Sequence, residues 1–301
     1  MNAAVLRPLE QAILQTVAYA DVFDYPLRLP ELHRYLIGQR APPTIVWKAL
    51  SSESLVPFLT RTDGYVSFRD REHLVHLRRE REEVARQLWP HAVRYGHLIG
   101  RLPFVRMVAV TGALAVNNVE PGADIDYLVV TEPGRLWICR AFVIGLVRLV
   151  RRHGVELCPN YFLSTRALAI PDRNLFTAHE LTQMVPLTGM AVYRRLRTIN
   201  RWTSVFLPNA DGPPPASPPN EKTNSPWGLL PSQVAERLLR TSPGCWLEEW
   251  EMNRKVRKFR AQANGNPEAA FAADWCKGHF DGYGRRTLRA YRQRLMRLGL
   301  E

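Results

Sequence analysis

Two aspartates separated by a single residue form the part of this sequence best suited to chemistry. Asp124 and Asp126 open an apolar run, residues 124–130, that predicts a strand. Because alternate side chains of a strand project from the same face, both carboxylates would point the same way. Carboxylate oxygens bind hard divalent cations such as Mg²⁺ or Mn²⁺, and a cation held in this way stabilises the charge that develops in phosphoryl or nucleotidyl transfer. We therefore expect a metal site at Asp124 and Asp126.

A glycine turn shortly before these aspartates is suited to phosphate. The apolar residues 108–110 predict a strand, which gives way at Thr111, Gly112 and Ala113 to the first turn of a short helix. Backbone N–H groups at such a turn can bind an anion. We expect these three residues to contact the phosphates of a nucleotide, next to the metal carboxylates.

The order of these features resembles a known signature. An apolar strand, Gly112-Ala113, a spacer and then Asp124-Ile125-Asp126 is similar to the pattern of the DNA polymerase beta superfamily of nucleotidyltransferases, over residues 104–163. The resemblance implies an α+β fold with a mixed sheet flanked by helices, a nucleoside triphosphate (NTP) as substrate, and Asp124 and Asp126 as ligands of Mg²⁺ or Mn²⁺. The family usually has a second Gly or a Ser where this chain has Ala113, which keeps the backbone donor but lacks a hydroxyl.

The same resemblance implies a third acidic ligand on a later strand. Residues 135–152 predict a helix and residues 155–163 the next strand, so that Asn160 falls at the third position, with Glu156 on the same face as the alternative. The carbonyl oxygen of Asn160 is a neutral and therefore weaker ligand for Mg²⁺. It also cannot act as a base toward an attacking hydroxyl. Three alternatives follow: weakened catalysis, catalysis assisted by the substrate, or loss of catalysis.

The first 68 residues predict a separate small domain. Three short helical segments precede two strands that flank Asp63-Gly64, a strong hairpin turn signal. This order resembles a winged helix, whose third helix would read DNA. Between residues 42 and 54, however, that helix has one cation, Lys48, and one anion, Glu53. Packing on the rest of the protein or on a partner is therefore favoured over DNA reading.

The remaining chain divides into five segments. The expected organisation is a connecting helix at 69–100, a nucleotidyltransferase-like core at 101–170, helices completing the cleft at 171–207, a proline-rich linker at 208–231 and a basic helical C-terminal region at 232–301. Within the cleft helices, His179, Glu180 and Gln183 are expected at the surface, and a position facing the cleft is the alternative. Within the C-terminal region, helices are expected at 232–239, 246–263, 271–279 and 283–298.

The charge of the chain is strongly positive and unevenly placed. The formal net charge is +13, and residues 254–297 hold twelve Lys or Arg against three acidic residues. Such a field attracts polyanions, including nucleotide phosphates and nucleic acid. The alternative is an ordinary solvated helix face.

Other classes of protein are disfavoured by composition. Four cysteines without paired spacing indicate a reducing, cytoplasmic setting. The longest apolar run, residues 141–147, is too short to span a bilayer, so we expect no membrane partner. No phosphate-binding P-loop, dinucleotide fingerprint or Ser-His-Asp motif is visible in the sequence.

Two functions remain open at this point. The first is a metal-dependent nucleotidyltransferase that moves a nucleoside monophosphate from an NTP to the hydroxyl of an acceptor, which the sequence does not identify. The second is a catalytically weak or inactive module of the same fold that acts as a nucleotide sensor, a regulator or a nucleic-acid-binding scaffold.

Overall fold

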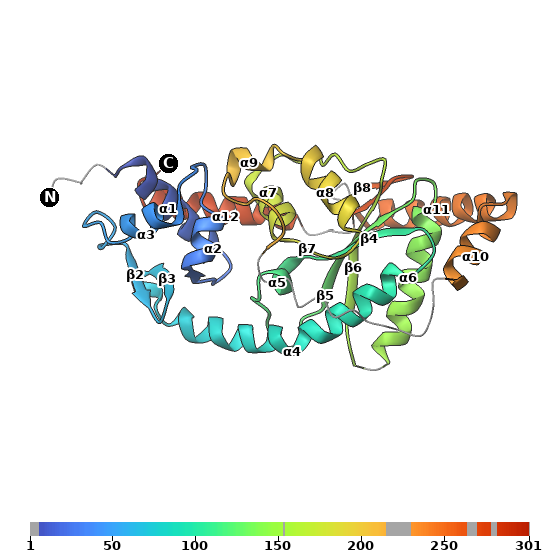
Figure 1. Ribbon diagram of the computed structural model, residues 1–301, viewed down its shortest axis with the longest axis horizontal. Coiled ribbons are helices and arrows are strands. Elements are labelled where there is room, and N and C mark those ends of the chain that lie inside the picture. The colour runs from blue at the N-terminus through green and yellow to red at the C-terminus, as the bar shows by residue number, and fades with distance from the viewer. Residues whose placement is uncertain (1–5, 153, 215–229, 264–269, 278–281, 301) are drawn as a thin grey trace.

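A helix of 27 residues, α4 (Leu74–Gly100), joins two units that both combine helices with strands (Figure 1). The computed structural model describes residues 6–152, 154–214, 230–263, 270–277 and 282–300. The expected α+β class is confirmed, since the second unit is built on a mixed sheet. None of the helices in these described ranges has the length and apolarity that crossing a bilayer needs.

The N-terminal unit contains three helices and a three-stranded antiparallel sheet of order β1-β3-β2. Its elements are α1 (Pro8–Asp21), β1 (Leu27–Arg28), α2 (Leu29–Arg34), α3 (Pro43–Ala49), β2 (Leu59–Thr62) and β3 (Tyr65–Phe68). Each helix has a proline in its first turn, where no backbone hydrogen bond is lost. Asp63 and Gly64 both have positive φ, as a tight hairpin turn requires. The two-residue strand β1 was not expected from the sequence.

The second unit is built on a six-stranded sheet of order β7-β4-β5-β6-β9-β8. Its strands are β4 (Val105–Val110), β5 (Ile125–Thr131), β6 (Leu157–Ser164), β7 (Val185–Thr188), β8 (Ala270–Ala272) and β9 (Trp275–Lys277). β5 and β6 run parallel, and every other neighbouring pair is antiparallel. Crossover from β5 to β6 passes through α6 (Leu136–Arg151).

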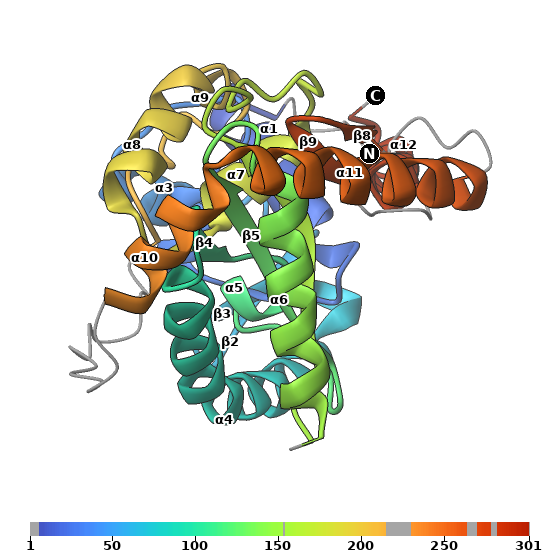
Figure 2. The ribbon, with the colours of Figure 1, turned by 90° about the vertical axis from the view of Figure 1, so that its right-hand side faces the viewer.

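Helices cover both faces of this sheet (Figure 2). Successive side chains of each strand point alternately to the two faces. Tyr127 and Val129 of β5 share a core with α4, α6 and α11 (Ser242–Ala263). Leu128 and Val130 belong to a second core with α7 (Leu175–Gln183) and α8 (Met190–Ile199). Because side chains two residues apart share a face, this alternation assigns Asp126 to the side of α7.

The segment expected as cleft helices also contains a strand. Between α7 and α8, β7 pairs with β4 along the edge of the sheet, and α9 (Thr203–Phe206) follows α8. Pro186, which lacks an N–H, is tolerated there because an edge strand needs hydrogen bonds on one side only. The segment 171–207 is therefore not wholly helical.

The expectation of a purely helical C-terminal region is wrong in one place. α10 (Leu230–Leu239), α11 and α12 (Tyr283–Arg297) are helices, but residues 270–277 form the β8–β9 hairpin where a helix at 271–279 was expected. Residues 278 and 279 lie outside the described part of the chain. β9 pairs with β6, so the exposed edge of the sheet decides the conformation rather than the local apolar pattern.

The C-terminal helix brings the two units together. α12 lies beside α1 and α7 (Figure 1), and Arg294 Nε donates to Asp21 Oδ2 at 2.7 Å. The described start of the proline-rich segment also contacts the N-terminal unit, because Arg34 donates to the carbonyl oxygens of Asp211 and Gly212. Residues 215–229 of the expected linker are outside the described ranges.

Candidate functional site

The turn between β4 and α5 (Gly112–Ala115) packs directly against Asp126. Gly112 has a φ of 66°, and a Cβ at this position would lie 2.4 Å from Asp126 Oδ2. Both the left-handed backbone and the close carboxylate therefore require glycine. The Thr111 N–H donates to the carbonyl oxygen of Asp126 at 3.1 Å, so phosphate binding at this turn would fall to the amides of Gly112 and Ala113.

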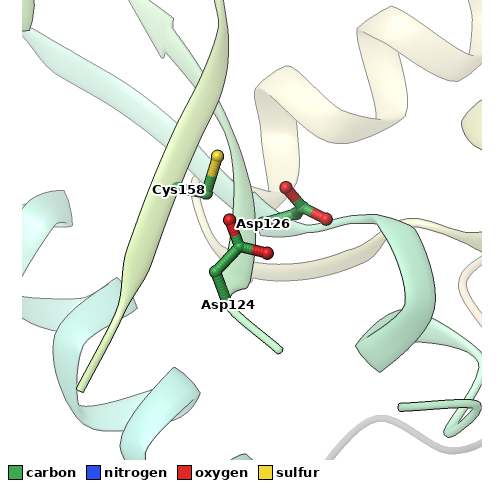
Figure 3. Close-up of side chains that lie close together, drawn as sticks. All are labelled: Asp124, Asp126 and Cys158. Atoms are coloured by element: carbon green, nitrogen blue, oxygen red, sulfur yellow. The ribbon is translucent and has the colours of Figure 1, made fainter. Parts of the chain in front are cut away.

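Asp124, immediately before β5, and Asp126, within β5, lie close together, with Cys158 of β6 beside them (Figure 3). One potential ligand atom from each of the three side chains lies within 4.8 Å of the others. Asp124 is exposed, whereas Asp126 and Cys158 are half-buried. The structure thus brings the two expected aspartates together and adds a thiol.

Asn160 contacts Asp126 but does not stand in the third ligand position. Its Nδ2 donates to Asp126 Oδ1 at 2.6 Å. In the parallel pairing of β5 with β6, Asp126 lies opposite Cys158, and a bulge then leaves Asn160 without a partner on β5. Asn160 therefore orients the carboxylate of Asp126, and the side chain that completes the cluster is Cys158.

Neither Cys158 nor the true position of Glu156 was anticipated. Cys158 lies two residues before Asn160 and so shares its face, which is the only sequence signal that points to it. The bulge that separates their roles depends on strand pairing and has no local signature. Glu156, the alternative third ligand, instead pairs with Arg151 at 2.9 Å.

Burial and crowding of negative charge dominate the electrostatics of the cluster. Burial raises the pKa of Asp126 to about 7, with the carboxylates of Asp124 and Glu180 adding to the effect in the same direction. Burial and the two aspartates also hold the pKa of the Cys158 thiol well above its usual range. A bound divalent cation would supply the opposite charge that this environment lacks.

The donor set fits a divalent cation. Two carboxylates suit Mg²⁺ or Mn²⁺, which prefer oxygen ligands. The thiol of Cys158 is a soft donor that suits Zn²⁺ better than Mg²⁺. The residues that would hold an ion are therefore Asp124 and Asp126, with Cys158 adjoining them.

Of the three polar residues of α7 that were expected at the surface, His179 is buried, Glu180 and Gln183 are half-buried, and all three line a cavity. His179 is buried, stacks on Tyr19 with ring centroids 4.0 Å apart, and has an Nδ1 that lies 3.2 Å from Gln183 Nε2. Burial lowers the pKa of His179 to about 3 and raises that of Glu180 to about 7. The expectation failed because α1 and α12, both distant in sequence, cover this helix.

A cavity of about 460 Å³ lies between the N-terminal unit and this site. Its wall includes Gly112 and Ala113 of the glycine turn and His179, Glu180 and Gln183 of α7. The other lining residues come from the N-terminal unit, α4, the loop before β5, and the starts of α7 and α12: Thr16, Tyr19, Ala20, Val22, Phe23, Asp24, Tyr25, Leu27, Tyr35, Arg81, Val116, Asn118, Glu120, Ala123, Phe176 and Tyr283. Sequence reasoning did not find this cavity because its wall combines segments that only the folded chain brings together.

No protein-family model, curated protein or solved structure matches this chain. The geometry of the site is therefore the basis for assigning a function.

Proposed function

We propose that this protein is a metal-dependent nucleotidyltransferase that moves a nucleoside monophosphate from an NTP to an acceptor hydroxyl. The observation that carries the proposal is the contact between the glycine turn and the paired aspartates. Gly112 lies against Asp126, and Asp126 lies with Asp124 in a cluster of potential ligand atoms within 4.8 Å. A phosphate-binding turn and a metal-binding carboxylate pair are thus available at one place.

Each residue would have a distinct task. Asp124 and Asp126 would hold Mg²⁺ or Mn²⁺, and the turn amides of Gly112 and Ala113 would bind the triphosphate. Asn160 keeps the carboxylate of Asp126 in place through its 2.6 Å hydrogen bond. When bound, the cation neutralises negative charge on the phosphates.

The reaction joins the acceptor oxygen to the α-phosphorus. The bond from that phosphorus to the oxygen bridging to the β-phosphate breaks, and pyrophosphate leaves with the electron pair. Because the amide of Asn160 cannot accept a proton, the hydroxyl proton passes to a non-bridging oxygen of the transferred phosphate. This substrate-assisted route is slower than one with a third carboxylate as base.

The proposal includes two fold assignments. For the second unit, a nucleotidyltransferase-like fold is supported by antiparallel β4 and β5 followed by parallel β6. For the first unit, a winged helix is supported by its helix and strand order and by the sheet order β1-β3-β2. Its third helix exposes Ile45 and Trp47 beside Lys48, which suits contact with a protein more than with DNA.

A second candidate function is a nucleotide sensor or scaffold without catalysis. It is favoured by Cys158 and Asn160, since neither supplies the third carboxylate. Nucleic acid would then be a partner of the exposed cations on α11, such as Arg257 and Lys258. For either function we propose a cytoplasmic location, supported by four free cysteines.

Thermal unfolding with each of ATP, GTP, CTP and UTP, with and without Mg²⁺, tests the site. The proposal expects stabilisation that requires Mg²⁺ and disappears in Asp126→Ala, while Glu83→Gln, an exposed change on α4, retains it. Transfer of label from an α-labelled NTP to acceptors in a cell extract then tests catalysis. Stabilisation without transfer would select the sensor. No response to any NTP would overturn both the transferase and the nucleotide sensor and would leave the scaffold.

A further inference from the structure

The cavity beside the glycine turn has an aromatic wall. Within the described part of the chain, six Tyr or Phe side chains line it: Tyr19, Phe23, Tyr25, Tyr35, Phe176 and Tyr283. The negative face of an aromatic ring attracts organic cations, and the attraction grows when both partners are shielded from water. Since the volume is about 460 Å³, the cavity has room for a small organic molecule.

Most charges in this wall are already neutralised. Arg81 Nη2 pairs with Glu120 Oε1 at 2.6 Å, and Asp24 pairs with Arg71. Because each of these ion pairs is neutral, they offer a ligand no net charge.

Glu180 is the exception. Its carboxylate makes no hydrogen bond or ion pair with any residue in the described ranges, and Lys277, which acts on it electrostatically, is paired with Asp172 at 3.1 Å. Glu180 also lies close enough to Asp126 to repel it. When ionised, Glu180 therefore presents among the aromatic rings a negative charge that no described residue pairs, which disfavours an anionic ligand and favours a cationic one.

The wall also holds an unused polar atom. His179 lines the cavity and is 4% exposed, yet its Nε2 has no hydrogen-bond partner among the described residues. A contact between Gln183 Nε2 and His179 Nδ1 would make Nδ1 the acceptor and leave the hydrogen on Nε2.

We propose that this cavity is the acceptor subsite of the enzyme and that it takes a small organic cation carrying a hydroxyl group. The ammonium head would lie against the aromatic rings and Glu180, with the hydroxyl toward the turn at Gly112, beside Asp126. The acceptor role rests on the proposed function, whereas binding of the cation does not. A nucleoside is the competing occupant, because a base would also stack on the rings.

Choline and 3,3-dimethyl-1-butanol have the same shape, but only choline carries a charge. A comparison of the two therefore separates the effect of charge on binding from the effect of shape. Calorimetric titration of the full chain in EDTA, without NTP, should show choline binding at least about tenfold more tightly than the alcohol. Glu180→Gln should remove that preference while leaving binding of the alcohol unchanged. Phe176→Leu should weaken choline, and the matched remote variant Glu83→Gln should bind both probes as the native protein does.

Several results would overturn the proposal. These are equal affinity for the two probes, a choline preference that survives in Glu180→Gln, no binding of choline, or competition by cytidine or adenosine that exceeds choline binding. Because no metal or NTP is present, the outcome is independent of the transferase assignment. Choline binding without any Mg²⁺-dependent NTP response would leave the cation site standing and refute the enzyme; the reverse result would refute the cation site alone.

Discussion

Cys158 stands where a third hard ligand would serve Mg²⁺ best. Its thiol lies opposite Asp126 across the β5–β6 pairing and within reach of the same ion as the two aspartates. A thiol shifts metal preference toward softer ions, whereas a carboxylate favours Mg²⁺. With the sulfur of Cys158 in place of an oxygen ligand, the cluster would bind Mg²⁺ more weakly.

Replacing Cys158 by aspartate should strengthen Mg²⁺ binding by about tenfold or more, because a third oxygen anion joins the site. The same change should weaken Zn²⁺ relative to Mg²⁺. Titration calorimetry with both ions measures the effect, and Cys158→Ser is the control that removes sulfur without adding charge. If the Cys158→Asp variant bound Mg²⁺ no better than the native protein, residues 124, 126 and 158 would not form a common metal site.

Gly112 is the second residue whose identity the site fixes. Alanine at this position would adopt a left-handed backbone at a cost of about 1–2 kcal/mol, and its Cβ would meet Asp126 Oδ2 at 2.4 Å. We expect Gly112→Ala to lower the melting temperature and to abolish Mg²⁺-dependent stabilisation by NTP, because the carboxylate of Asp126 must move. Ala113→Gly, a change of the same size one residue later, should retain the nucleotide response. An unchanged response in Gly112→Ala would contradict this arrangement.

At the scale of elements, α7 owes its buried polar face to its neighbours. His179 stacks on Tyr19 of α1, and Tyr35 and Tyr291 pack into the same cluster. The cost of ionising His179 there holds its pKa near 3, below the ordinary value of 6.5. The contact between α1 and α7 should therefore depend on pH.

The direction of this dependence follows from proton uptake. Between pH 6.5 and about 3 the unfolded chain binds a proton at His179 while the folded protein does not, so the free energy of unfolding should fall as pH falls. Glu180 acts in the opposite sense, because its raised pKa favours the folded form below pH 7. Its contribution is the same in the native protein and in a variant changed only at His179, so it cancels when the two are compared.

Urea unfolding from pH 7 to pH 4 measures the difference. Relative to the native protein, His179→Phe should gain stability with falling pH, by up to about 1.4 kcal/mol per pH unit, since it retains a ring against Tyr19 but cannot ionise. His76→Phe, at an exposed position on α4, should show no such gain. Parallel curves for native protein and His179→Phe would show that His179 is protonated in the folded state.

Local pattern was sufficient for the parts of the site that lie close in sequence. Gly112, Asp124 and Asp126 were found because a turn and a strand of period two carry their own signatures. Cys158 was missed because its place in the cluster depends on a bulge in the pairing of β6 with β5. The β8–β9 hairpin was missed because it depends on pairing with the other edge of β6. Strand register and edge pairing are properties of the assembled sheet, so no window of sequence contains them.

At the scale of the whole molecule, the two units are held together by a buried arginine as well as by α12. Arg78 of α4 is 1% exposed and donates to Glu31 Oε1 at 2.9 Å in the N-terminal unit. Its other amino group donates to the carbonyl oxygens of Val116 and Asn117, at 3.0 and 2.7 Å, in the loop that leads from α5 toward Asp124. The guanidinium also covers the ring of Tyr25, which lines the cavity. One side chain thus fixes the N-terminal unit against the segment that carries the site.

Arg78→Met should therefore destabilise the protein by about 3–5 kcal/mol, because it leaves the carboxylate of Glu31 and two carbonyl oxygens without their buried donor. Arg79→Met is the matched control: Arg79 is half exposed and pairs at 2.8 Å with the exposed Asp63, so its loss should cost at most about 1 kcal/mol. Urea unfolding gives both values, and hydrogen exchange should locate the added flexibility of Arg78→Met at residues 116–124 as well as in α2. Equal small losses in the two variants would mean that Arg78 is not needed to hold the two units together and that the cavity does not depend on it for its shape.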